Sequence, residues 1–108
     1  MDLFKAKTVR QCIDLATVDA HDDSEIAIGW ETCLDEVFAD AHAQLAGQDV
    51  KLEGFEAPAG TVVARCRIKR RKIRVTLDSV DFVALTTPQK IWLKAFLKWQ
   101  EQGRGYYA

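Results

Sequence analysis

Apolar and polar residues alternate along this sequence with two different periods, which divide it into helical and strand regions. Apolar residues recur every three or four positions in 8–18, 22–38 and 88–101, a spacing typical of one face of a helix. From 41 to 85 they alternate with polar residues instead, which predicts strands at 41–45, 49–55, 61–69, 72–77 and 82–85. The pattern therefore predicts an α+β fold with two N-terminal helices, about five short strands and one C-terminal helix.

Capping residues mark where the three predicted helices begin. Thr8 and Asp22 are each followed three residues later by Gln or Glu, which is the spacing of a capping box. Thr87 is the predicted cap of the last helix, because Pro88 after it suits the first helical position. Gly103 is predicted to end that helix. Each helix therefore has a predicted starting residue.

The strand region predicts a small antiparallel barrel. Gly47 and the segment 58–60 separate the first strands, and Gly54 interrupts the alternation, so a bulge is expected there. Residues 78–81 suit a single tight helical turn before the last strand. Five short antiparallel strands with such a turn suggest an SH3-like barrel, an analogy of fold that identifies no activity.

The last predicted helix has an apolar face and a charged face. Trp92, Phe96 and Trp99 recur at helical spacing, so we expect them to pack against the sheet. The charged face carries a stripe of solvent-exposed lysines: Lys90, Lys94 and Lys98.

Length and composition limit the class of protein. The 108 residues are predicted to form a single domain, 1–108, large enough to bury a core without disulfides. Cys12, Cys33 and Cys66 occupy apolar positions and form no Cys-x-x-Cys pair, which predicts buried free thiols. Nothing resembles a signal peptide or a transmembrane span, so we predict a cytoplasmic protein with no membrane partner.

Charge is distributed unevenly, although the formal net charge is only −1. Residues 1–50 contain three basic and eleven acidic side chains, whereas residues 51–108 contain twelve basic and five acidic ones. Binding partners are therefore considered separately for each half of the chain.

The motifs of common catalytic sites are absent from the sequence. It contains no Gly-x-Ser-x-Gly, Walker loop, His-Glu-x-x-His or Gly-x-Gly-x-x-Gly motif. His21 and His42 lie outside any recognisable motif. We therefore predict a protein that is not an enzyme.

The acidic segment 19–38 is the first candidate binding site. No Lys or Arg neutralises it, because none occurs between Gln11 and Val50. Calcium takes six to eight oxygen ligands in a tolerant geometry, although the spacing here is not that of an EF-hand. The candidate metal ligands are Asp19, Asp22, Asp23, Glu25, Glu31 and Asp35. Helix capping and a solvent-exposed acidic face also explain these residues.

One run of residues within the acidic segment is distinctive. It reads Asp19-Ala20, Asp22, Glu25, Ala27-Ile28-Gly29-Trp30 and Leu34-Asp35-Glu36. In order and spacing this run resembles the small bacterial calcium-binding proteins of the CcbP type. The aromatic-Pro link that follows the helix in that family is absent, since residues 39–42 read Ala-Asp-Ala-His. The specific resemblance covers about a fifth of the chain. It implies that family's fold and calcium as the bound ion.

A basic hairpin within 65–75 is the second candidate site. A two-residue turn at Arg70-Arg71 pairs Ile68 with Ile73 on its inner face. The outer face then carries five cations: Arg65, Arg67, Lys69, Lys72 and Arg74. Like charges on one face repel, which favours an anionic partner such as nucleic acid or an acidic protein. Alternatively, the hairpin only exposes its charges to solvent or faces the protein's own acidic helix.

Overall fold

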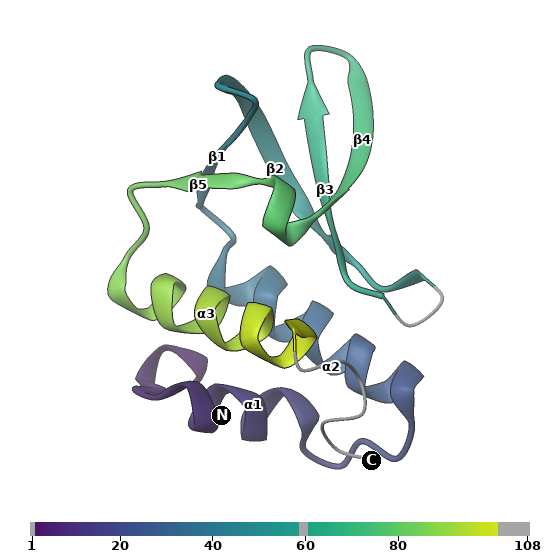
Figure 1. Ribbon diagram of the computed structural model, residues 1–108, viewed down its shortest axis with the longest axis vertical. Coiled ribbons are helices and arrows are strands. Elements are labelled where there is room, and N and C mark those ends of the chain that lie inside the picture. Colours follow the sequence, from purple (N-terminus) through teal and green to yellow (C-terminus); the bar gives the residue numbers. More distant parts are fainter. Residues whose placement is uncertain (1, 59–60, 102–108) are drawn as a thin grey trace.

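Helices and strands occupy separate layers of the molecule, with the sheet above the helices in Figure 1. The computed structural model describes residues 2–58 and 61–101. Its helices are α1 (Val9–Thr17), α2 (Asp23–Val37) and α3 (Thr87–Glu101), and its 3₁₀ turns include η1 (Leu3–Lys5) and η3 (Leu77–Ser79). Its strands are β1 (His42–Leu45), β2 (Gln48–Glu56), β3 (Val63–Ile68), β4 (Arg71–Thr76) and β5 (Asp81–Val83). The predicted α+β class and the predicted order of elements are confirmed.

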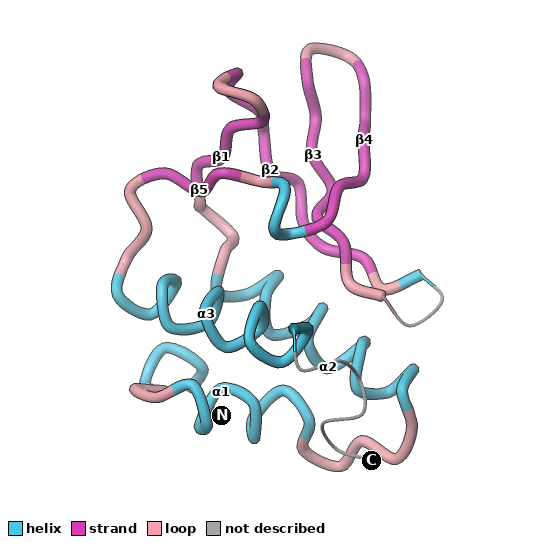
Figure 2. The backbone as a smooth tube through the Cα atoms, in the orientation of Figure 1, coloured by secondary structure: helices cyan, strands magenta, loops and turns pink. Residues whose placement is uncertain are grey.

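The five strands form one antiparallel sheet with the order β4-β3-β2-β1-β5. The turn η3 precedes β5, as the sequence predicts, and carries the chain from one edge of the sheet to the other (Figure 2). Among the described residues β4 and β5 pair only with β3 and β1, so the sheet is not closed. The predicted barrel is therefore an open sheet here, and its SH3-like character stays a prediction.

A bulge at Gly54 bends β2 where the strand approaches α2. Leu52 pairs with Cys66 and Gly54 with Arg65, so Glu53 is an extra residue in the pairing. Gly54 has a φ of 151°, a value that residues with a side chain rarely adopt. The predicted bulge is confirmed, and glycine is what permits its backbone geometry.

The turn of the β3–β4 hairpin lies one residue earlier than predicted. Ile68 pairs with Arg71 and Cys66 with Ile73, so Lys69-Arg70 form the turn. The predicted turn at Arg70-Arg71 is therefore wrong, because Lys69 takes the positive φ of 56° that the turn requires. Since moving the turn by one residue moves the pairing by two, every strand residue keeps its predicted face.

Helix α2 lies at the centre of the fold, because both its middle and its end carry buried aromatic rings. Trp30 contacts Trp92, Phe96 and Trp99 of α3, with ring centroids 6.0, 5.3 and 5.5 Å away. Phe38, which caps α2, contacts Phe55 and Phe82 of the sheet, with centroids 5.8 and 5.1 Å away. The rings of α3 are thus buried in the same core as the sheet residues, and their ring contacts include Trp30 of α2, a partner that the sequence prediction did not name.

Gly29 sets how closely α1 approaches α2. A side-chain carbon at this position would lie 2.0 Å from the backbone oxygen of Ala16, so nothing larger than glycine fits. The close contact lets Cys12 and Ala16 of α1 become almost fully buried. The glycine within the acidic helix is therefore explained by packing.

Helix α3 is capped by Thr86 rather than by the predicted Thr87. The backbone N–H of Gln89 donates to Thr86 Oγ1 at 3.3 Å, and the N–H of Thr86 donates to Gln89 Oε1 at 2.9 Å. This reciprocal pair is a capping box. Gln89 Nε2 also donates to the Val37 carbonyl at 3.1 Å, which fixes the start of α3 to the end of α2. The predicted end at Gly103 lies outside the described residues.

No helix in the described part of the chain is long and apolar enough to cross a membrane.

Candidate functional site

The carboxylates at the start of α2 are used for capping. Asp22 Oδ1 accepts a hydrogen bond from the backbone N–H of Glu25 at 2.8 Å, so the predicted cap is confirmed. Glu25 Oε2 accepts from the N–H of His21 at 3.0 Å. Asp19 is exposed with a positive φ of 60°, and the side chain of Asp23 lies outside the described part of the structure. A helix N-terminus attracts anions and repels cations, so this group is poorly placed to hold a metal.

Glu31 and Asp35 lie farther along α2 and belong to a different group. Asp35 is thirteen residues beyond Asp22, which at 1.5 Å per helical residue is about 20 Å. The structure therefore does not bring the six predicted ligands together around one ion. Within residues 2–58 and 61–101, no three His, Cys, Asp or Glu side chains are arranged to hold a metal ion.

Asp35 meets the sheet at the Gly54 bulge. Its Oδ1 accepts a hydrogen bond from the backbone N–H of Phe55 at 2.7 Å. A side-chain carbon at Gly54 would lie 3.0 Å from Asp35 Oδ1 and 3.0 Å from Arg65 Nη2. The Asp35 carboxylate and the Arg65 guanidinium are therefore near neighbours across the bulge.

Glu31 and Glu56 complete this group, and we call Glu31, Asp35, Glu56 and Arg65 the junction cluster. Arg65 Nη1 forms an ion pair with Glu56 Oε1 at 3.1 Å. Partial burial raises the pKa of Glu31 above its ordinary value, and the charges of Asp35 and Glu56 raise it further. Arg65 acts in the opposite direction. Arg65 is thus shared by three carboxylates, of which Glu56 also pairs with Arg74, and its charge does not bring the pKa of Glu31 back to the ordinary value.

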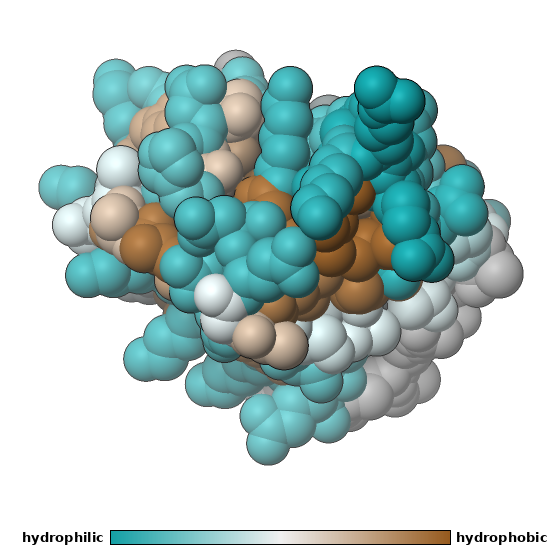
Figure 3. Space-filling model, turned by 90° about the horizontal axis from the view of Figure 1, so that it is seen from above, coloured by the Kyte–Doolittle hydropathy of each residue, from teal (hydrophilic) through white to brown (hydrophobic). Residues whose placement is uncertain are grey.

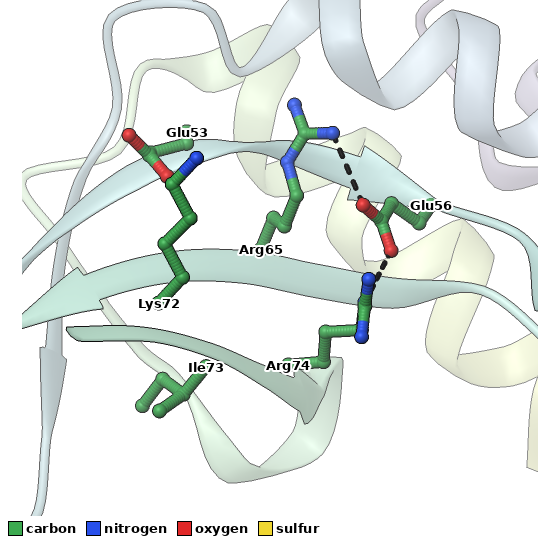
Figure 4. Close-up of a pocket in the computed structure, with 6 residues that line it drawn as sticks. All are labelled: Glu53, Glu56, Arg65, Lys72, Ile73 and Arg74. Carbon is green, nitrogen blue, oxygen red and sulfur yellow. Dashed lines mark hydrogen bonds and ion pairs between the residues drawn. The ribbon is translucent and has the colours of Figure 1, made fainter.

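The outer face of the hairpin is partly neutralised by β2, as Figure 4 shows for Arg65 and Arg74, which both point toward Glu56. Hydrogen bonds from Arg74 and Arg65 lower the pKa of Glu56. Arg67 Nε pairs with Glu53 Oε2 at 2.8 Å. These side chains border a hollow of about 550 Å³, which is lined by Glu53, Glu56, Arg65, Lys72, Ile73 and Arg74.

Glu53 and Glu56 were not among the residues predicted from the sequence. A signal was present, because Glu53 lies in the predicted strand 49–55 and Glu56 directly follows it, ahead of the basic hairpin. Of the five predicted outer-face cations, Arg65, Arg67 and Arg74 pair with these two glutamates. Lys69 lies in the turn, and Lys72 is exposed on β4.

The fold and the junction cluster define a small α+β protein with an acidic helix against an open sheet. No protein-family model matches the sequence, and no curated protein matches it. Two solved structures share the fold. The crystal structure of Anabaena CcbP is 16% identical, with a TM-score of 0.69 over 89% of this chain and 91% of that one. A calcium-binding protein in its calcium-binding form is 16% identical, with a TM-score of 0.68 over 95% and 97%. The predicted resemblance to CcbP-type proteins is thus confirmed for the fold.

Proposed function

We propose that this protein binds a divalent cation, and that calcium is the ion, through the acidic side of α2. The junction cluster carries the proposal: its three carboxylates are not arranged to hold an ion in this structure, so binding requires them to converge. Partial burial raises the pKa of Glu31, and the carboxylates of Asp35 and Glu56 raise it further. Carboxylates that repel one another at a partly desolvated position are stabilised when a cation joins them.

The chemistry of the donors favours calcium over softer metals. Glu31, Asp35 and Glu56 offer only oxygen atoms, which suit hard cations. Calcium accepts irregular oxygen shells that water and backbone carbonyls can complete, whereas magnesium demands a stricter octahedral geometry. A solved protein of similar fold that binds calcium supports the same choice.

The first turn of α2 is the second location within this proposal. Asp19, Asp22, Asp23 and Glu25 are the ligands that the sequence predicts around the helix start. None of the described ion pairs involves Asp19, Asp22 or Glu25. Two of them already accept hydrogen bonds from backbone N–H groups at the helix start. The junction cluster is therefore the preferred location.

Arg65 is the internal cation with which calcium must compete. Its guanidinium pairs with Glu56 and lies beside Asp35, which are the oxygens that calcium needs. Replacing Arg65 with a neutral residue of similar length removes that competitor. If calcium binds at the junction cluster, Arg65→Gln should therefore bind calcium more tightly than the wild type.

Thermal unfolding with and without calcium tests the proposal. An ion that binds only the folded state stabilises it by about 2.7 kcal/mol at a hundred times its dissociation constant. For a domain of this size, that gain raises the Tm by on the order of 10 °C. Magnesium at equal ionic strength should produce a clearly smaller shift.

Charge-removing variants locate the ion. Glu31→Gln with Asp35→Asn should abolish the calcium shift, while Asn can still accept the hydrogen bond from Phe55. Asp22→Asn is the matched control, because Asn also caps helices well. It should keep the shift. Loss of the shift in Asp22→Asn alone would instead move the ion to the start of α2. Equal effects of calcium and magnesium on the wild type would refute the proposed function.

A further inference from the structure

The β3–β4 hairpin carries cations that the acidic residues of the sheet do not neutralise. Within the described part of the chain, the ion pairs of the hairpin involve only Arg65, Arg67 and Arg74. The side chains around its turn are left without such pairs. We use the name basic tip for Lys51, Arg67, Lys69, Arg70, Arg71 and Lys72.

The geometry of the strands concentrates these charges. Lys51 lies directly opposite Arg67, and Arg67 lies directly opposite Lys72, so three cations form a row across β2, β3 and β4. Side chains that face each other in this way are about 5 Å apart, and like charges at that distance are unfavourable. Lys69 and Arg70 extend the row around the turn, where Lys69 holds an uncommon positive φ of 56°.

The basic tip is far more charged than the protein as a whole. The tip holds six cations, and two acids of β2 lie beside them: Glu53, which pairs with Arg67, and Asp49, two residues from Lys51. The local charge is therefore about +4, whereas the formal net charge of the chain is −1. The hairpin extends away from the helical layer, and with it from the acidic helix α2 (Figure 1). Figure 3, which looks onto the sheet from above, shows hydrophilic side chains over this end, next to an apolar area.

The residue types of the basic tip indicate which class of partner it can bind. The hairpin segment 63–76 contains no aromatic residue, so it has nothing to stack on unpaired bases, and its arginines and lysines can contact the phosphates of any sequence. The large hydrophobic side chains that are exposed lie elsewhere, at Phe4, Val18, Ile28 and Val83, so the tip has nothing to insert into a lipid layer. Its only strong feature is dense positive charge.

Duplex DNA offers the complementary feature. It carries one negative charge per about 1.7 Å of helix axis, denser than the carboxylates of an extended acidic peptide. A two-stranded β-ribbon also fits the major groove of B-DNA. We propose that the basic tip binds the phosphate backbone of double-stranded DNA without sequence preference. This binding is separate from the proposed calcium site and does not require it.

Binding of a fluorescently labelled DNA duplex, followed by anisotropy at rising salt with a chelator present, tests the inference. The test variant is Lys69→Gln/Arg70→Gln/Lys72→Gln. The control is Lys90→Gln/Lys94→Gln/Lys98→Gln, which removes the same charge from exposed lysines on α3. The wild type should bind unrelated duplexes equally, with a slope of log affinity on log salt of about −4 to −5. The tip variant should lose at least about tenfold in affinity at low salt and flatten the slope by about 2.7, whereas the control should change less than about threefold.

Other outcomes overturn the inference. The inference is wrong if the wild type does not bind DNA at low salt, or if the tip and control variants lose the same affinity. It is also wrong if the protein binds phosphatidylserine vesicles or polyglutamate but does not bind DNA. Circular dichroism shows whether the variants fold. If the turn substitutions unfold the protein, Lys51→Gln/Lys72→Gln removes two tip charges from strand positions and must still weaken binding. Because calcium is chelated throughout, failure of the calcium proposal leaves this test unaffected.

Discussion

At the residue scale, one backbone position controls how closely the acidic helix approaches the sheet. Gly54 has a φ of 151°, and a side-chain carbon there would lie 3.0 Å from both Asp35 Oδ1 and Arg65 Nη2. Glycine therefore permits both the bulge in β2 and the contact between α2 and β3. Any larger residue must change the backbone or displace the charged groups.

We expect Gly54→Ala to lower the free energy of unfolding by about 2–4 kcal/mol, as measured by urea unfolding. Gly47→Ala is the control, because Gly47 also has a positive φ (81°) but nothing lies within 4 Å of the added carbon. It should cost only about 1 kcal/mol. Equal losses in the two variants would show that contacts with Asp35 and Arg65 do not matter.

The sequence predicts local features of individual residues better than it predicts their distant partners. The cap at Asp22 and the bulge at Gly54 follow from residue type and spacing, and both are present. The hydrogen bond from Phe55 to Asp35 joins residues twenty positions apart, so it depends on how helix and sheet pack. The grouping of Glu31 and Asp35 with Glu56 could not be predicted for the same reason.

At the scale of elements, the start of α3 shows how two adjacent threonines are distinguished. Pro88 suggests Thr87 as the cap, but Gln89 lies three residues after Thr86 and completes a capping box with it. The buried Gln89 also binds the carbonyl of Val37. The Thr86-x-x-Gln89 signal was therefore in the sequence, although the proline pointed to the neighbouring residue.

Thr86→Ala should destabilise the protein by about 1 kcal/mol, because it removes the oxygen that accepts from the Gln89 N–H. Thr87→Ala, one residue on and exposed, should change stability by less than about 0.5 kcal/mol. Thermal unfolding followed by circular dichroism measures both. If Thr87→Ala lowers the free energy of unfolding more than Thr86→Ala does, then Thr87 is the cap, as the sequence alone suggests.

Element boundaries were easier to predict than the contacts between elements. The strands and helices appear close to their predicted positions, because periodicity is a local property. The rings of α3 were predicted to pack against the sheet, yet they contact Trp30 on α2. An apolar stripe shows which face of a helix is buried but not which element covers it.

At the scale of the whole molecule, the acidic and basic halves of the sequence form separate charged surfaces, one on α2 and one on the β3–β4 hairpin. The acidic face of α2 meets the basic hairpin at its base, where Arg65 lies near Asp35 and acts on the charge of Glu31. Of the hairpin cations, Arg65 therefore lies toward the protein's own acidic helix, which was one of the alternatives from the sequence. Arg67 and Arg74 pair with acids of β2 instead. The remaining cations extend beyond these contacts, and for this reason the two proposed binding surfaces are separate.

The three cysteines are buried in different parts of the fold, so their ionisation and reactivity depend on whether the whole domain is folded. Cys12, Cys33 and Cys66 lie on α1, α2 and β3, and all are free and buried. Burial raises the pKa of Cys12 to about 11, with a smaller contribution from Cys33. Burial, followed by the charge of Glu36, raises the pKa of Cys33 to about 11. The pKa of Cys66 is also raised, chiefly by burial.

Raised thiol pKa values make stability depend on pH in one direction. The folded state holds these protons more tightly than the unfolded chain, whose thiols titrate near pH 8.5. The stabilisation is therefore fully present below about pH 8.5 and is lost as pH rises toward about 11. Urea unfolding should show a loss of about 1 kcal/mol for each of Cys12 and Cys33 between pH 8 and pH 9.5. Cys12→Ala should remove its own share of that loss.

Thiol labelling distinguishes global from local opening. At pH 8 a reagent such as 5,5′-dithiobis(2-nitrobenzoate) should modify none of the three cysteines until urea unfolds the protein, and then all three should react together. This is expected because the three residues belong to one buried cluster that joins both helices to the sheet. Rapid modification of Cys12 alone would mean that α1 opens independently of α2. The close approach at Gly29 would then contribute less to the cooperativity of the fold than its geometry indicates.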